Sequence, residues 1–112
     1  MTQADKGHVS SPCYAVVFVS RRTPTDDGYA DAQTRMEELV ANQPGYLGVR
    51  SIRGPDGDGI TVVFFESRET AAAWGQHPEH RAVMQRGRDA WYEDYEIYYA
   101  PVERAHSFRK KR

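Results

Sequence analysis

The sequence contains very little cysteine: Cys13 is the single one in 112 residues. One cysteine rules out a disulfide within the chain, so a reducing compartment is the simplest expectation. Cys13 stands beside Tyr14 at the start of a predicted strand, where a thiol is more often inert than reactive. We therefore expect an inert thiol, with a redox role as the alternative.

Long apolar runs are missing as well. No stretch approaches the ~20 apolar residues that a membrane-spanning helix needs, and the polar N-terminus lacks the apolar segment of a secretory signal. The formal net charge is only −1, which gives no general reason to expect nucleic acid or an anionic membrane as a partner. Together these absences favour a cytoplasmic protein.

Polar segments at both ends bound one domain of ordinary size. Residues 1–12 are polar and rich in glycine, serine and proline near their end, a composition typical of a disordered tail. Residues 104–112 form a basic tail, for which a solvated end is favoured over a nucleic-acid or membrane arm because no organised basic patch stands behind it. Residues 13–103 are left as the folded domain.

Six elements are predicted between these tails. Runs of β-branched and aromatic residues predict four strands, and apolar residues at helical spacing predict two helices. The second helix is expected to restart at Pro78, because proline suits a first helical position. In chain order the elements are a strand over 14–19, a helix over 29–40, strands over 46–52 and 60–65, a helix after Ser67 that fades near Gly87, and a strand from Trp91 to about Val102.

The order β-α-β-β-α-β predicts an α+β fold of ferredoxin-like type, with two helices on one face of a four-stranded antiparallel sheet. The strands at 14–19 and 60–65 are apolar on both faces. Helices can cover only one of these faces, and a bare apolar sheet would be a large exposed patch. A second copy of the chain is the simplest cover, which predicts a homodimer with its sheets packed face to face.

Several short motifs resemble those of one known family. The turn Pro44-Gly45-Tyr46-Leu47-Gly48, between a helix and a strand, resembles the Pro-Gly-Phe-Leu-Gly turn of the antibiotic biosynthesis monooxygenase (ABM) family of dimeric α/β-barrel proteins. The resemblance covers about residues 14–103. The other matching segments are Gly59-Ile-Thr-Val, Trp74 with His77 and His80, Arg86-Gly87-Arg88, and Trp91-Tyr92.

The resemblance implies either cofactor-free oxygenation of an aromatic or phenolic substrate, or haem degradation, since the family contains both. The haem-degrading branch uses an Asn on the first strand, a Trp late in the second helix and a His ten residues later. Trp74 matches the tryptophan, but residues 14–19 contain no Asn and Met84 stands at the histidine position. The resemblance therefore implies a monooxygenase without a cofactor, and the alternative is a non-catalytic ligand-binding or stress-related dimer of the same fold.

The second helix carries the candidate site. Trp74, His77, Arg81 and Met84 follow one another at spacings of 3, 4 and 3, so on a continuous helix they would share one face, with His80 at its margin. That face would line a pocket between helix and sheet suited to a flat aromatic ligand. Phe65 is a candidate for the aromatic wall of this pocket.

Each candidate has a chemical and a structural interpretation. In the first, His80 or His77 is the general base, Arg81 holds the developing anion, Trp74 stacks on the ring and Met84 lines the pocket. In the second, Trp74 is core, His77 caps a helix junction and His80 bonds a backbone carbonyl. A metal site is not expected, because His77 and His80 lack a third ligand in the sequence.

Overall fold

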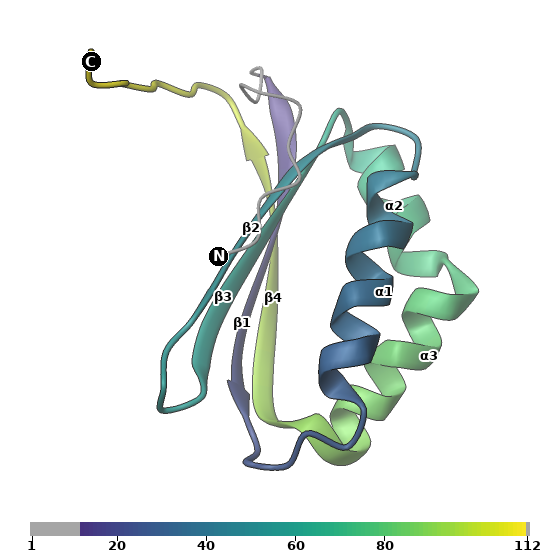
Figure 1. Ribbon diagram of the computed structural model, residues 1–112. Helices are drawn as coiled ribbons and strands as arrows, with labels where there is room; N and C mark the ends of the chain where they lie inside the picture. The colour runs from purple at the N-terminus through teal and green to yellow at the C-terminus, as the bar shows by residue number, and fades with distance from the viewer. Residues whose placement is uncertain (1–11, 112) are drawn as a thin grey trace.

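Four strands form one antiparallel sheet, and the helices pack on one of its faces (Figure 1). The computed structural model describes residues 12–111. The strand order is β2-β3-β1-β4, which confirms the predicted ferredoxin-like fold. The strands are β1 (Cys13–Arg22), β2 (Tyr46–Arg53), β3 (Asp58–Phe65) and β4 (Tyr92–Val102).

The second helical segment is broken where the sequence predicted. Ser67 caps α2 by accepting a hydrogen bond from the Thr70 amide at 3.1 Å, and His77 then adopts an extended conformation with ψ 126°. Pro78 begins the next helix at its first position. The helices are α1 (Tyr29–Ala41), α2 (Arg68–Gln76), α3 (Pro78–Arg86) and a single π-helical turn, η1 (Gly87–Trp91).

Trp91 lies in the π turn and not in the last strand, which corrects the predicted start of β4. Its side chain is only 2% exposed, and its Nε1 donates to the carbonyl oxygen of Asp27 at 3.0 Å. The indole therefore points inward and ties η1 to the loop between β1 and α1. Thr23 adds a second tie from this loop, since its hydroxyl donates to the Ala90 carbonyl at 2.8 Å.

The turn at Pro44-Gly45 has a physical reason for its glycine. Gly45 has a φ of +80°, and a Cβ there would lie 2.6 Å from the side chain of Thr70 on α2. The Gly45 carbonyl also accepts from the Glu66 amide at 2.8 Å. The turn that resembles the ABM motif thus packs the entry of β2 against the start of α2, where a side chain would not fit.

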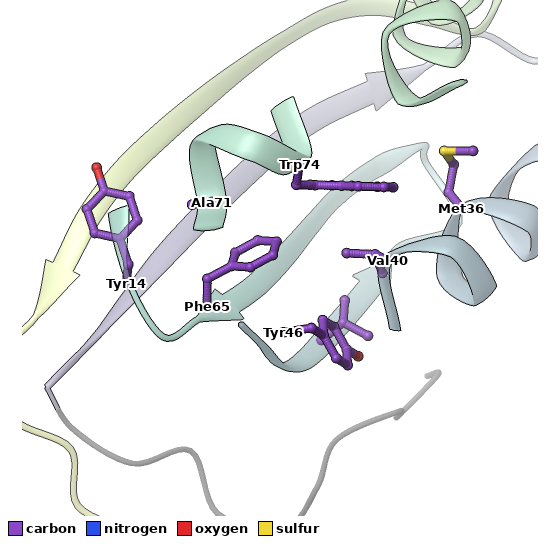
Figure 2. Packing of buried hydrophobic residues seen from close by; sticks show 8 residues of the cluster. Tyr14, Met36, Val40, Tyr46, Phe65, Ala71 and Trp74 are labelled. Atoms are coloured by element: carbon purple, nitrogen blue, oxygen red, sulfur yellow. The ribbon is translucent and has the colours of Figure 1, made fainter. Parts of the chain in front are cut away.

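The core lies between the sheet and α1 and α2 (Figure 2). Phe65 is 0% exposed and Trp74 6%. The helix α1 buries Ala32, Met36 and Val40, residues four apart on one face, as predicted. Figure 2 shows the indole of Trp74 extending from α2 toward Met36, above the sheet.

The other face of the sheet has no helix of residues 12–111 against it (Figure 1). Strand residues alternate between faces, so Val62 and Ile60 point away from the helices while Val63 points toward them. Several large side chains stand exposed on this face: Ile52 at 67%, Ile60 at 49% and Tyr98 at 51%.

The C-terminal residues 103–111 leave the sheet without regular structure, and their side chains are exposed. Most of the predicted N-terminal tail, 1–11, lies outside the described residues, and the proposed domain boundaries stay predictions. No helix within residues 12–111 has the length and apolar character needed to cross a membrane. The cytoplasmic location stays a prediction.

Candidate functional site

A cavity of about 140 Å³ lies between the helices and the sheet. Its walls come from all four strands, from α1, α2 and α3, and from the π turn. The lining is mostly apolar and aromatic, with a few polar groups at defined places, which is the usual character of a site for a small organic ligand.

The floor of the cavity changes character along the strands. Three successive rows of paired residues cross the sheet on the helix side. The row under α2 is apolar, the middle row carries two hydroxyls, and the row near the β2–β3 hairpin carries a charge. From the apolar end the rows are Val49, Val63, Val16 and Tyr99; then Ser51, Thr61, Phe18 and Ile97; then Arg53, Gly59, Ser20 and Tyr95. Arg53 is the member of the last row that lines the cavity.

Trp74 and His80 form a stacked pair in the cavity wall. The two ring centroids are 4.2 Å apart and the ring planes differ by 18°. His80 Nδ1 lies 3.1 Å from the carbonyl oxygen of Trp74. The break at His77 makes this contact possible, because it turns the chain between the two residues and brings the first turn of α3 back over the end of α2.

The surroundings of His80 favour its neutral form. Burial lowers the pKa of the imidazole below its ordinary 6.5, more than the hydrogen bond to the Trp74 carbonyl raises it, and the charge of His77 lowers it further. A carbonyl oxygen can only accept, so in the neutral ring Nδ1 carries the proton and Nε2 carries a lone pair. No residue in the described part of the chain hydrogen-bonds Nε2. His80 therefore presents a base at the cavity.

Arg53 supplies positive charge at the hairpin end. Its guanidinium crosses β3 at Gly59 and reaches β1, where Nη2 donates to the hydroxyl of Ser20 at 2.6 Å, and Nη1 donates to the carbonyl of Gly57. A Cβ at position 59 would lie 2.6 Å from the Arg53 Cζ. The absence of a side chain at Gly59 thus lets the guanidinium lie on the floor of the cavity.

Two tyrosines close the same end. The rings of Tyr29 and Tyr92 meet edge to face with centroids 6.1 Å apart, and Arg22 lies over the Tyr29 ring at 3.5 Å. Burial raises the pKa of the Tyr92 hydroxyl above its usual value, with a further contribution from Tyr29 that the charges of Arg53 and Arg22 partly offset. Tyr92 therefore stays a protonated donor at neutral pH.

Three of the six predicted site residues line this cavity: Trp74, His80 and Met84. His77 does not, and it caps α3 by accepting from the Glu79 amide at 3.2 Å. Arg81 is exposed and Phe65 is packed in the core cluster, and neither belongs to the lining. The shared helical face expected for these residues does not exist, because His77 interrupts the helix. The predicted chemical roles stay predictions.

Sequence reasoning missed Arg53, Gly59, Tyr29 and Tyr92 as site residues. A usable signal existed for Arg53, since a two-residue period along β2 puts it on the same face as Val49 and Ser51. Within residues 12–111, no group of three or more His, Cys, Asp or Glu side chains is arranged to hold a metal ion.

Comparison with known proteins gives matches over most of the chain. The family model described as antibiotic biosynthesis monooxygenase matches residues 13–86. The uncharacterized protein YqjZ of Bacillus subtilis is 43% identical over 99 residues, which is 88% of this chain and 87% of that protein.

Two solved structures share the fold. SnoaB, a cofactor-independent oxygenase from Streptomyces nogalater, has a TM-score of 0.68 at 10% identity, over 89% of this chain and all of that one. A dimeric ferredoxin-like protein of unknown function from Thermobifida fusca has a TM-score of 0.67 at 15% identity, over 88% and 99% of the two chains. At these identities the likeness concerns the fold alone.

Proposed function

This chain belongs to the antibiotic biosynthesis monooxygenase family, and on that premise we propose that it is a cofactor-independent monooxygenase acting on a small aromatic or phenolic substrate. The observation that carries the proposal is the Trp74–His80 pair in the cavity wall. It combines a flat aromatic surface with a neutral imidazole in one place. SnoaB, similar in fold, is a cofactor-independent oxygenase.

The proposed reaction needs a base and a site that holds a flat ring. His80 Nε2 removes a proton from the substrate carbon or phenol, and the resulting carbanion or phenolate transfers one electron to O₂. The two radicals join through a new C–O bond to give a peroxide, which takes a proton back from His80. The O–O bond then breaks with loss of water and leaves a carbonyl on the ring, so one oxygen atom enters the product and one leaves in water.

Two further lining residues, Trp74 and Met84, have a part in this scheme. The indole of Trp74 binds and orients the ring. Met84, from α3, contributes apolar surface to the same wall. The apolar lining keeps water away, which protects a reactive carbanion or peroxide from side reactions.

We also propose that the chain is a homodimer through the sheet face without helices. Ile60 and Ile52 stand exposed there. With Val62 they line an open depression that also carries the charged side chains of Arg21, Arg50, Asp58, Asp94 and Glu96. Large apolar side chains exposed together on a sheet favour burial against a copy of the same face. A dimeric ferredoxin-like protein is among the structures of the same fold.

Oxygen uptake tests the enzymatic proposal. A panel of phenols and anthrones is added to the metal-free, flavin-free protein, and O₂ consumption is followed with an electrode while the product is identified by mass. Incorporation of one atom from ¹⁸O₂ into the product is the expected result. Binding of panel members in the cavity without O₂ consumption would favour the non-catalytic ligand-binding dimer instead.

A further inference from the structure

We infer that the hairpin end of the cavity binds an anionic oxygen through Arg53, so that the ligand is an aromatic skeleton carrying a carboxylate or phenolate group. This inference deepens the proposed function by describing the substrate. It rests on the proposed function in one respect, because it takes the bound ligand to be the substrate of the monooxygenase. It assigns the anion-holding part to Arg53 on β2, in place of the exposed Arg81 on α3.

No carboxylate within residues 12–111 forms an ion pair with Arg53. Its partners are the hydroxyl of Ser20 and the carbonyl oxygens of Ser20 and Gly57, all uncharged acceptors. Arg53 takes no part in the ion pairs of Arg21 with Asp58 and of Arg35 with Glu79. A half-buried guanidinium without a carboxylate partner is well suited to a bound anion, because hydrogen bonds between charged partners are the strongest of their kind.

Donors remain for that anion. A guanidinium has five N–H groups, and the contacts to Ser20 and Gly57 use three, two from Nη1 and one from Nη2. The Nε hydrogen and one Nη2 hydrogen are left, which is the pair that a carboxylate binds in a fork. Glu37 on α1 is the other charged residue of the lining, and it has no ion pair with Arg53.

Neighbouring hydroxyls extend the polar end. Ser51 and Thr61, one row closer to Trp74, bond each other at 2.7 Å. Tyr92 and Tyr29 lie across the same end of the cavity. Apolar and aromatic surface is contributed farther along the cavity by Trp74, Met36, Val40 and Val83, so the positive charge and the paired hydroxyls lie at one end of it.

The span between the two ends sets the ligand's shape. Val49 and Arg53 are four residues apart on β2, a distance of about 13 Å in an extended strand. The guanidinium of Arg53 lies across β3 at Gly59, at one end of this interval. A ring skeleton of about two fused rings with one terminal anion would place its rings beside Trp74 and His80 and its charge at Arg53.

The test compares two probes of the same shape, 2-naphthoate and its uncharged amide, 2-naphthamide. Binding of each to the full chain is measured by calorimetry at pH 7.5. The wild type is expected to bind naphthoate about tenfold or more tighter than naphthamide, the order expected for a hydrogen bond to a charged group. Arg53→Met should bring the ratio close to one, whereas Arg53→Lys should keep part of it.

Two further variants separate this role from a structural one. Gly59→Ala keeps the charge but pushes the guanidinium off the floor, because the new methyl would meet its Cζ, and it should lower the ratio while the protein stays folded. Arg50→Met removes a positive charge from the same strand on the opposite face and should leave the ratio unchanged. An equal preference of the wild type for both probes, or an unchanged ratio in Arg53→Met and Gly59→Ala, would overturn the inference.

The outcome is separable from that of the proposed function. Loss of naphthoate preference in the Arg53 and Gly59 variants supports the anion site whether or not any phenol is oxidised. Conversely, O₂ consumption by a wild type that does not distinguish the two probes would support the monooxygenase and reject the anion site.

Discussion

The imidazole of His80 lies nearly parallel to the indole of Trp74 at a centroid distance of 4.2 Å, and its Nδ1 is held by the carbonyl oxygen of the same tryptophan. One residue thus fixes both the position and the tautomer of the other. A histidine held in this way is preorganised for proton transfer, since Nε2 is left as the acceptor. The same contacts would also serve a purely structural histidine, so the two roles must be separated by experiment.

Replacing His80 with Phe separates the two roles. Phenylalanine keeps the stacking on Trp74 but removes the base, so we expect turnover to fall by roughly 10²–10⁴-fold, the usual worth of general-base catalysis. The melting temperature should change little. Oxygen consumption and thermal unfolding are measured on the same sample, and His80→Ala serves as the comparison that loses both base and packing.

The contrary result is specific. If His80→Phe keeps wild-type turnover per folded molecule while His80→Ala melts early, then His80 is structural and the base lies elsewhere.

The burial of His80 predicts an acid-sensitive stability. Its pKa is below 6.5 in the folded protein and near 6.5 in the unfolded chain, so between these values the unfolded state binds more protons. The free energy of unfolding should therefore have its full value above about pH 6.5 and decrease as the pH falls below 6.5. Denaturant unfolding at steps from pH 7.5 to 5 measures this loss.

Two controls accompany the pH series. His80→Phe should flatten the loss between pH 6.5 and 5, whereas His106→Gln, at an exposed position, should not. The Arg35 guanidinium lowers the pKa of Glu79 below its ordinary 4.5. Any stability that this ion pair contributes is therefore lost at a lower pH than the His80 contribution, and His80→Phe does not change it. A wild-type stability that stays level from pH 7.5 to 5 would contradict the assigned burial effect.

The fold was predictable because its signals are local. The apolar face of α1, the β-branched and aromatic runs of the strands, the Ser67 cap and the restart at Pro78 each depend on neighbours a few residues apart. The π turn was not predictable in this way. Trp91 looks like a strand residue locally, and its inward position depends on a hydrogen bond to Asp27, 64 residues earlier.

The sequence predicted cavity residues only on the second helical segment, where spacing along the chain was the guide. Trp74, His80 and Met84 reach the cavity, but the expected alignment of His77 and Arg81 with them assumed a continuous helix. Arg53 was missed because the predicted strand ended at residue 52, one residue short of β2, and because its contacts depend on strand pairing, which sets Gly59 beside it and Ser20 beyond. Such cross-strand neighbours follow from the register and not from spacing along the chain.

Removing residues 104–112 should leave the folded domain intact. The side chains of 104–111 are exposed, with Phe108 at 84%, so little apolar surface is lost on truncation. We expect a chain ending at Glu103 to keep its melting temperature within a few degrees and its oligomeric state. A much lower melting temperature, or a dimer that dissociates on truncation, would mean that the tail docks on the partner chain.

Two adjacent valines on β3 offer a matched pair of substitutions that tests the proposed dimer interface. Val62 and Val63 are neighbours of identical size, but Val62 faces away from the helices while Val63 packs against the core cluster. Val63→Asp buries a charge in the core, which costs several kcal/mol and should unfold the chain at any concentration. Val62→Asp puts the same charge on the proposed interface, so it should give a folded monomer.

Ultracentrifugation and circular dichroism together distinguish these outcomes. The wild type should sediment as a dimer at micromolar concentration, and Val62→Asp as a monomer with a native spectrum. Arg50 is the cross-strand neighbour of position 62, but desolvating the new carboxylate between two sheets costs more than one such neighbour returns. If folded Val62→Asp is still a dimer, the interface lies on another surface of the protein. A wild type that sediments as a monomer would leave the outward-facing Ile52, Ile60 and Val62 without the partner proposed for them.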